Sequence, residues 1–262
     1  METNIESETR LSGEQLKFYH ENGYIVVEDL ISSDELDGLQ TRLHEYTHSG
    51  RDTGKLRIQV EPRVTRGELS VDHPGDGIRK IDGLVVNDDL FQRLGRHNNI
   101  VGIIEQVLGP DLKMFRNALL LKPPGVGSAK GMHQDSPYWP IEPMSLCSCW
   151  FALDDANEKN GCMNVLPRGH RNGPLPHVHV TDDFVVEESA YDSGKAVSAP
   201  VRAGGGLFFH SLVPHGTGPN RSDKWRRAIA LSYMSSRSIH TREDAGPEYF
   251  PVKGRTFPEC VR

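Results

Sequence analysis

Apolar residues recur at the spacing of an α-helix in three stretches of the first 110 residues. Ser12 and Ser32 each begin a capping box, which is typical of a helix N-terminus, and the apolar positions of 33–46 follow the second box. The third stretch, 100–108, ends at Gly109, which is followed by proline. These patterns predict a mostly helical segment, which one short apolar strand at 24–27 interrupts.

The periodicity is lost between 49 and 82, where Gly, Arg, Asp and Pro are frequent. A stretch of this length without a pattern predicts a loop that is functional or mobile. Its arginines, at 51, 57, 63 and 66, are compatible with an anionic group on a substrate, but a solvated loop surface is the simpler interpretation.

Beyond residue 110 the pattern changes to short apolar runs separated by turns rich in Gly, Pro, Asn and Asp. Runs of this kind cover 114–121, 146–153, 163–166, 197–201, 206–209 and 229–233. Many short strands with such turns are typical of a β-sandwich or barrel of the jelly-roll type. We therefore expect a single domain over 1–262 that is mainly β with N-terminal helices. Its double-stranded β-helix core (jelly-roll or cupin-like) is expected at 111–240, buttressed by α-helices and a variable loop at 1–110, with a C-terminal tail at 241–262.

Composition and charge narrow the class of protein. Of the 262 residues, 36% are hydrophobic and 25% are charged, a balance typical of a globular protein. The net charge of −6 argues against nucleic acid as a partner, and no apolar stretch approaches the roughly 20 residues that cross a membrane. The four cysteines lack the spacing of a zinc site and are expected to be buried and reduced. Since the N-terminus is polar and unlike a signal peptide, we expect a cytoplasmic protein.

His133 and Asp135 form an H-x-D pair in the stretch MHQDSPYW, which by itself is equally compatible with a hydrogen-bonded pair in a loop. His215 follows 80 residues after the aspartate, at the end of an apolar run, and Arg226 lies 11 residues further on. In an antiparallel strand pair, an offset of this size can place the arginine on a strand beside that of the histidine. The four residues are therefore candidates for one site.

Two histidines and one carboxylate form the facial triad of non-haem Fe(II) oxygenases, which leaves coordination positions open. A 2-oxo acid cosubstrate such as 2-oxoglutarate takes two of these positions, and O2 takes the third. The distal carboxylate of 2-oxoglutarate then needs a planar cationic partner, which a bidentate arginine such as Arg226 supplies. A nearby hydroxyl group, such as that of Thr217, can donate one more hydrogen bond to it.

Several motifs together resemble the phytanoyl-CoA dioxygenase (PhyH-like) family of Fe(II)/2-oxoglutarate-dependent oxygenases. They are the H-x-D pair, the 11-residue step from His215 to Arg226, and the flanking LLLKPPG, NGCMNVLPRGH and VPHGTGPN. The opening LSGEQLKFYHENGYIVVEDLISSDEL is also similar to the start of that family. The resemblance runs from about 11 to 235 and is weakest over 50–80.

The resemblance implies roles for individual residues. It implies His133, Asp135 and His215 as the iron ligands, Arg226 and Thr217 at the distal carboxylate of 2-oxoglutarate, and Gln134, Trp150 and Lys80 in the cofactor pocket. Halogenating relatives have a small residue in place of the aspartate, which leaves room for chloride. The presence of Asp135 therefore favours oxygen transfer or oxidation over halogenation.

Other polar residues compete for these roles. His210 lies five residues before His215 and is expected to be a core histidine or to lie behind the ligands. Structural or surface positions are expected for His170, His177 and His179. Arg227 follows Arg226 on the same predicted strand, so the two must face opposite sides. Tyr138 and Trp139 are compatible with either the core or the substrate pocket.

The sequence favours an Fe(II)/2-oxoglutarate-dependent dioxygenase that hydroxylates or otherwise oxidises a C–H bond of a small-molecule substrate and releases succinate and CO2. A second interpretation is a cupin-like hydrolase or isomerase that uses zinc or manganese, and a third is a non-catalytic jelly-roll binding protein. Arg226, at its fixed step from His215, has no evident purpose in the second. Neither the substrate nor the oligomeric state is predicted by these motifs.

Overall fold

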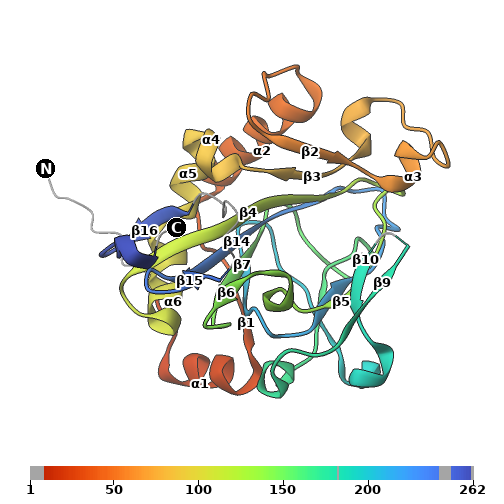
Figure 1. Ribbon diagram of the computed structural model, residues 1–262. Helices are drawn as coiled ribbons and strands as arrows, with labels where there is room; N and C mark the ends of the chain where they lie inside the picture. Colours follow the sequence, from red (N-terminus) through yellow and green to blue (C-terminus); the bar gives the residue numbers. More distant parts are fainter. Residues whose placement is uncertain (1–8, 182, 242–248, 261–262) are drawn as a thin grey trace, which may run out of the picture.

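Two antiparallel β-sheets form the centre of the computed structural model, which describes residues 9–181, 183–241 and 249–260 (Figure 1). The larger, eight-stranded sheet has the order β1 (Tyr24–Val27), β12 (Gly206–His210), β7 (Cys147–Ala152), β14 (Arg226–Ser235), β4 (Leu112–Lys122), β3 (Ile78–Asp82) and β2 (Arg57–Val60), with β16 (Phe250–Lys253) paired to β4. The four-stranded sheet has the order β11 (Val197–Ala199), β8 (Met163–Val165), β13 (His215–Thr217) and β5 (Lys130–His133). Two small sheets pair β9 (His177–Val180) with β10 (Asp183–Val186) and β6 (Ile141–Glu142) with β15 (Ile239–His240). The predicted jelly-roll fold is confirmed.

Helices cover one face of the larger sheet (Figure 1). They are α1 (Gly13–Asn22), α2 (Ser33–His48), α3 (Pro62–Thr65), α4 (Leu84–Asn87), α5 (Asp89–Gly95) and α6 (Asn98–Leu108). Both predicted capping boxes form, since the Ser12 and Ser32 hydroxyls accept from the backbone N–H three residues on. Gly23 ends α1 in the left-handed region at φ 81°, where glycine is free of strain. Within the described ranges, no helix is long and apolar enough to cross a membrane.

Strand alternation divides the side chains of the larger sheet between two apolar layers. On β7, Cys149 and Phe151 lie in the layer shared with the helices. Trp150 and Ala152 point the other way, into the layer shared with Met163 and its neighbours on the smaller sheet. The predicted burial of Cys147, Cys149 and Cys162 is confirmed, and all four cysteines are free thiols. A functional group on the inner face of either sheet therefore lies between the sheets.

The stretch 49–82, predicted to be a loop, is partly β-structure instead. Its two strands β2 and β3 extend the larger sheet beyond β4, to which β3 pairs through Lys80, Ile81 and Asp82. Every residue of β2 is exposed, and the charged residues of β3 hide its alternation, so neither strand has the apolar pattern of a core strand.

The two sheets also extend beyond 111–240, the range expected to hold them. The larger sheet takes β1, β2 and β3 from the first 110 residues and β16 from the predicted C-terminal tail. The remainder of that tail includes 242–248 and 261–262, which lie outside the described residues.

Candidate metal centre and cofactor pocket

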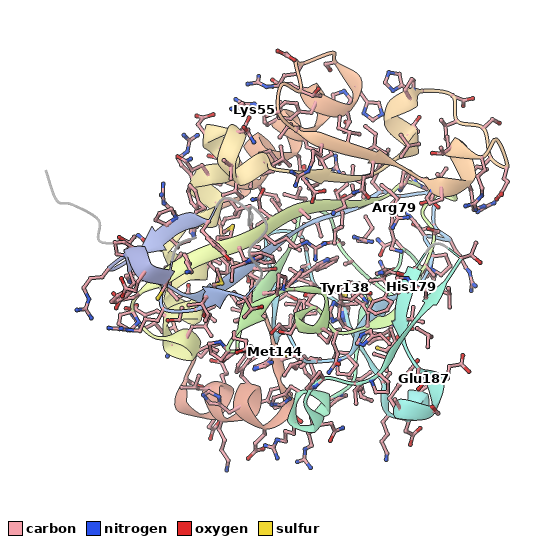
Figure 2. All side chains as sticks on the ribbon, viewed as in Figure 1. Lys55, Arg79, Tyr138, Met144, His179 and Glu187 are labelled. Atoms are coloured by element: carbon pink, nitrogen blue, oxygen red, sulfur yellow. The ribbon has the colours of Figure 1, made fainter. Side chains whose placement is uncertain are left out.

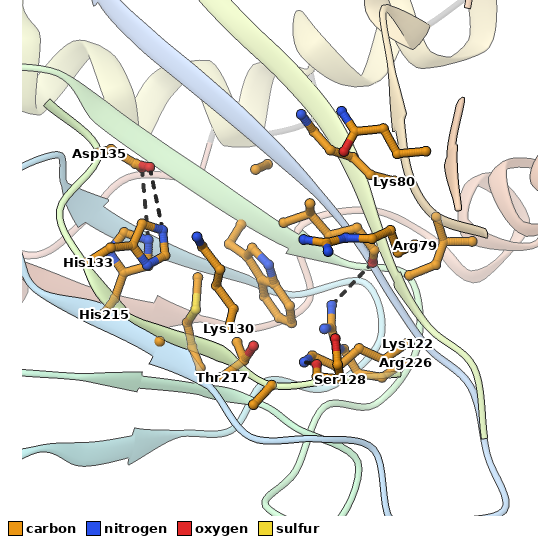
Figure 3. Close-up of a pocket in the computed structure, with 18 of the residues that line it drawn as sticks. Arg79, Lys80, Lys122, Ser128, Lys130, His133, Asp135, His215, Thr217 and Arg226 are labelled. Atoms are coloured by element: carbon orange, nitrogen blue, oxygen red, sulfur yellow. Dashed lines mark hydrogen bonds and ion pairs between the residues drawn. The ribbon is translucent and has the colours of Figure 1, made fainter. Parts of the chain in front are cut away.

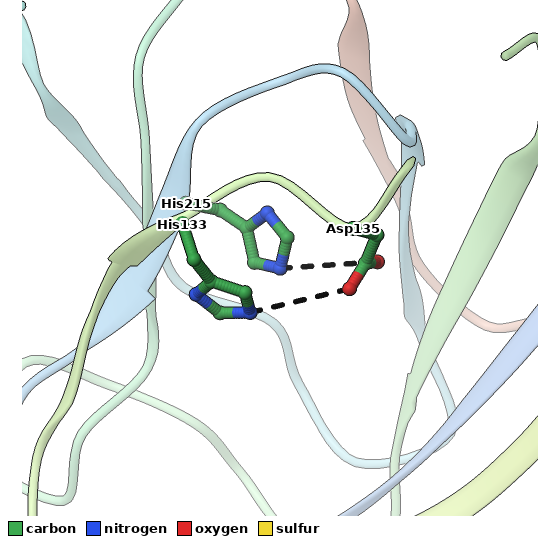
Figure 4. Close-up of side chains that lie close together, drawn as sticks. All are labelled: His133, Asp135 and His215. Atoms are coloured by element: carbon green, nitrogen blue, oxygen red, sulfur yellow. Dashed lines mark ion pairs between the residues drawn. The ribbon is translucent and has the colours of Figure 1, made fainter. Parts of the chain in front are cut away.

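His133, Asp135 and His215 come together between the two sheets (Figure 4). His133 ends β5 and His215 begins β13, and the two are directly paired across these antiparallel strands. Asp135 follows β5 after one residue and turns its carboxylate toward both rings. Each histidine Nε2 lies 4.0 Å from a carboxylate oxygen of Asp135, and the three ligand atoms lie within 4.8 Å of one another. One carboxylate and two imidazoles thus surround a single point.

The two imidazole rings are held in the orientation that a metal ion requires. Nδ1 of His133 lies 2.9 Å from the carbonyl oxygen of Gly131, and Nδ1 of His215 lies 2.9 Å from that of Val213. A carbonyl only accepts, so each Nδ1 carries the proton and each Nε2 presents its lone pair to the common point. Burial lowers the pKa of both histidines, which keeps the rings neutral and available as ligands.

Asp135 is held by the backbone and by a cation. Its N–H donates to the carbonyl of Ser211 at 2.9 Å, which fixes the turn after β5. Nη1 of Arg116, on β4, lies 3.6 Å from the carboxylate oxygen Oδ1. The arginine therefore offsets the negative charge of the ligand set from the side of the larger sheet.

A cavity of about 250 Å³ extends from this triad to Arg226 (Figure 3). Of the residues expected in the cofactor pocket, Thr217, Trp150 and Lys80 line this cavity together with Arg226 and the triad. Figure 3 shows Lys130 and Thr217 between the triad and Arg226. Its length and its two chemically different ends match a ligand that has a metal-chelating head and a distal anion.

Arg226 lies at the far end with unused hydrogen-bonding capacity. The side chain is buried, and its Nη1 donates to the carbonyl of Leu120 at 3.2 Å. Its Nε and the indole Nε1 of Trp150 are buried donors without a hydrogen-bond partner, and the guanidinium lies 5.2 Å from the centre of the indole. Among the described residues no carboxylate forms an ion pair with Arg226. Burial lowers its pKa to about 9, so it remains a cation at neutral pH. Two orphaned donors at a buried cation fit a carboxylate ligand.

The sequence analysis missed a second cation at this end, Lys122. It lies opposite Arg226 in the register of β14 with β4, and its amino group donates to the carbonyl of Ser128. Burial, followed by the positive charge of Arg226, lowers its pKa to about 6. The lysine ends the apolar run LLLK, where a charged residue at the end of a buried strand was the available signal.

Several candidates lie away from the cavity. Gln134 is fully buried, but its amide donates to the carbonyls of Gly173 and Leu212 and accepts from the N–H of Leu175. Its place in the cofactor pocket was expected, and the structure instead shows it tying together three loop segments. Arg227 faces away from Arg226, as expected, and forms a bidentate ion pair with Asp154 at 2.7 Å.

The other histidines also lie outside the triad. His210 accepts from the N–H of Leu212 and packs 5.4 Å from the ring of His170. On the β9–β10 hairpin, His177 and His179 pack against Phe184, so they are not simply surface residues. Figure 2 shows His179 on this hairpin and Tyr138 between it and the sheets. Tyr138 lies 6.0 Å from the ring of His133, centre to centre, and its hydroxyl contacts the carbonyl of Phe184.

The model of one protein family, the phytanoyl-CoA dioxygenase (PhyH) family, matches residues 19–228. The chain belongs to this family. The matched range contains the triad, Thr217 and Arg226. The chain is 31% identical to the peroxisomal phytanoyl-CoA dioxygenase of Rattus norvegicus, covering 96% of this chain and 74% of the relative. It is 27% identical to the probable phytanoyl-CoA dioxygenase of Caenorhabditis elegans, covering 86% of this chain and 76% of the relative.

Solved structures share the fold at lower identity. EctD from S. alaskensis, solved with 2-oxoglutarate and 5-hydroxyectoine, superposes with a TM-score of 0.75 at 18% identity and covers 97% of this chain and 92% of its own. The epimerase SnoN, in complex with Fe3+, alpha ketoglutarate and nogalamycin RO, superposes with a TM-score of 0.67 at 20% identity and covers 91% of this chain and 93% of its own. With the family match, the expected enzyme class of 2-oxoglutarate-dependent oxygenase is confirmed.

Proposed function

We propose that the protein uses Fe(II), 2-oxoglutarate and O2 to oxidise a C–H bond of a small-molecule substrate, with hydroxylation as the ordinary outcome and succinate and CO2 as coproducts. One observation carries this proposal. The same cavity holds a two-histidine, one-carboxylate triad at one end and a buried arginine with an unpartnered Nε at the other. A metal-chelating dicarboxylate satisfies both ends at once.

In this proposal His133, Asp135 and His215 hold the iron. Arg226 binds the distal carboxylate of 2-oxoglutarate, and the hydroxyl of Thr217 donates to the same group. When bound, Fe(II) with 2-oxoglutarate supplies the activation of O2 and the oxidative decarboxylation that yields succinate and CO2. The buried walls of the cavity, which include Trp150 and Phe209, exclude water from the reacting atoms.

The alternatives receive less support from the same residues. In a zinc or manganese hydrolase, nothing would call for a buried cation with an orphaned donor at the far end of the cavity. In a binding module, the matching tautomers of two neutral histidines around one carboxylate would have no purpose. Because Asp135 occupies the third ligand position, we also propose oxygen transfer rather than halogenation.

The role of Arg226 is tested by a matched pair of variants on one strand. Fe(II)-loaded protein is titrated anaerobically with 2-oxoglutarate, and the metal-to-ligand charge-transfer absorbance is followed. Arg226→Gln should weaken 2-oxoglutarate binding roughly 30-fold, because a buried charge-assisted pair is lost. Arg227→Gln removes the neighbouring ion pair with Asp154, outside the cavity, and should leave the affinity near that of the wild type. Equal affinities in all three proteins would refute the assignment of Arg226.

The cytoplasm remains the proposed location, supported by four free cysteines of which three are buried. The relative from Rattus norvegicus is named as peroxisomal, so fractionation of the native source is the direct test. Recovery of the protein with a peroxisomal fraction would contradict the proposal.

A further inference from the structure

A second cavity, of about 710 Å³, adjoins the cofactor pocket. It is lined by Lys55, Arg57, Lys80, Asp82, Gly83, Val86, Asn87, Phe115, Arg116, Asn117 and Trp139. Lys80 and Arg116 line both cavities, so the two spaces meet at these side chains. Because Arg116 also contacts Asp135, a molecule in the second cavity has a short path to the metal ligands.

The wall shared by the two cavities is one continuous face of the larger sheet. The register pairs Gln59 of β2 with Lys80 of β3, and Lys80 with Leu120 of β4. Gln59, Lys80 and Leu120 all line the first cavity. Arg57 lies two residues before Gln59 and therefore points to the same face, further from the metal. The missed strands β2 and β3 thus carry the wall of the second cavity out from the cofactor pocket.

This second cavity has an excess of positive charge. Its lining has four cationic side chains and one carboxylate, Asp82, which is 2.9 Å from the amino group of Lys80. In the part of the chain that the structure describes, neither Lys55 nor Arg57 takes part in an ion pair, in contrast to Arg51, which pairs with Glu45. Figure 2 shows Lys55 near the outer end of this part of the molecule. These two cations are free to bind an anion.

The opposite part of the lining is aromatic. The rings of Phe115 and Trp139 form an edge-to-face pair with centres 5.1 Å apart, and Arg116 lies 5.8 Å from the centre of the Trp139 ring. Both aromatic side chains are only half-buried, so they offer apolar surface to a ligand. The cavity therefore presents cations at its outer end and an apolar surface toward the metal.

We propose that this cavity binds the prime substrate, and that the substrate is an organic anion with an apolar body. Its carboxylate or phosphate group binds Lys55 and Arg57, and its apolar part lies on Phe115 and Trp139 and reaches past Arg116 to the metal centre. This assignment rests on the proposed function for the chemistry, but it adds the class of substrate and the residues that select it. Of the four arginines at 51, 57, 63 and 66, only Arg57 lines the cavity.

The test compares small probes of equal apolar body and different charge. Phenyl phosphate, phenylacetate and benzyl alcohol are titrated into the anaerobic protein loaded with Fe(II) and 2-oxoglutarate, and tryptophan fluorescence reports binding near Trp139. At least one of the anions should bind roughly tenfold tighter than benzyl alcohol. Whether phosphate or carboxylate is preferred then identifies the anionic group. Equal affinity for the anions and the alcohol would overturn the proposal.

Variants locate the binding site. The double substitution Lys55→Gln and Arg57→Gln should abolish the tenfold preference, whereas Arg63→Gln, an exposed arginine of the same segment outside both cavities, should retain it. An undiminished preference in the double variant would also overturn the proposal. The charge-transfer band of the wild-type sample separates the two claims. With the band present and no anion preference, only the substrate assignment fails; without the band, the proposed function itself fails.

Discussion

Lys122 and Arg226 place two cations side by side at the buried end of the cofactor pocket. Across the paired strands β4 and β14 they are direct neighbours, and the other charged groups that act on Lys122 are Glu61 and Arg79. Burial lowers the pKa of Lys122 to about 6, so in the free protein its amino group is neutral at pH 7.5. The pocket thus has one permanent cation and one group that becomes a cation when a negative charge arrives.

This arrangement predicts proton uptake when 2-oxoglutarate binds. The distal carboxylate stabilises the protonated amine and raises the pKa of Lys122 toward its ordinary value, so about one proton should be taken up per ligand at pH 7.5. Calorimetric titration of the Fe(II)-loaded protein in two buffers with different ionisation enthalpies measures this number. Lys122→Met should bring it close to zero, and Lys195→Met, at an exposed lysine, should leave it unchanged. Uptake that persists in Lys122→Met would contradict the account.

At the scale of single residues, the sequence predicted the parts of the site that lie in short motifs. His133, Asp135, His215 and Arg226 were recognised because their types and spacing match one chemistry. Lys122 and Arg116 were missed because their position depends on the register of β4 with β14, which no local pattern specifies. Gln134 was misplaced because neighbouring residues in a turn can face different ways, and its amide satisfies three backbone groups.

Among the elements, β13 is the one that fixes the geometry of the metal centre. It lies between β5 and β8 and sets His215 directly opposite His133. Gly216, the next residue, allows the close approach, because a Cβ there would lie 2.9 Å from the carbonyl oxygen of Lys130 and 3.1 Å from backbone atoms of the two residues that follow it. Any side chain at this position must push β13 away from β5.

A substitution at Gly216 should therefore damage the site without touching a ligand. We expect Gly216→Ala to lower 2-oxoglutarate turnover on the order of 100-fold, since a displacement of about 1 Å is sufficient for a loss of that size. Gly218→Ala is the matched control, because a Cβ at Gly218 has no atom within 4 Å. Activities that are equal in the two variants would show that the spacing of β5 and β13 does not govern the site.

The elements that the sequence predicted have local signals, and those it missed do not. The capping boxes at Ser12 and Ser32 predicted α1 and α2, because helix termini are specified within a few residues. The strands β2 and β3 were missed because their sequences RIQV and IRKID reflect the cavity that they line rather than the core. Tertiary pairing with β4 decides their conformation, and a single sequence does not reveal it.

In the whole molecule, the proposed cofactors connect the two sheets. The iron ligands lie on and beside β5 and β13 of the smaller sheet, and Arg226 and Lys122 lie on β14 and β4 of the larger one. A ligand that spans the cavity therefore stabilises the contact between the sheets. Binding to the folded state alone raises the free energy of unfolding by about 2.7 kcal/mol when the ligand is present at 100 times its dissociation constant.

Thermal unfolding should show this connection in two steps. Fe(II) alone is expected to raise the midpoint temperature, and 2-oxoglutarate is expected to add roughly 5 °C or more under anaerobic conditions. In Arg226→Gln the first increment should persist and the second should shrink, because the metal ligands are intact and the distal partner is lost. A 2-oxoglutarate increment of full size in this variant would argue that the cosubstrate binds elsewhere.

The central claim is that one triad and one buried arginine make this chain an Fe(II)/2-oxoglutarate-dependent oxygenase, and its most direct test is succinate and CO2 release. Protein reconstituted anaerobically with Fe(II) and 2-oxoglutarate is exposed to O2 without a prime substrate, and the coproducts are measured. We predict slow uncoupled turnover that disappears in His133→Ala, Asp135→Ala and His215→Ala. Turnover that survives loss of a ligand, or wild-type protein that releases no succinate and forms no charge-transfer band, would contradict the account.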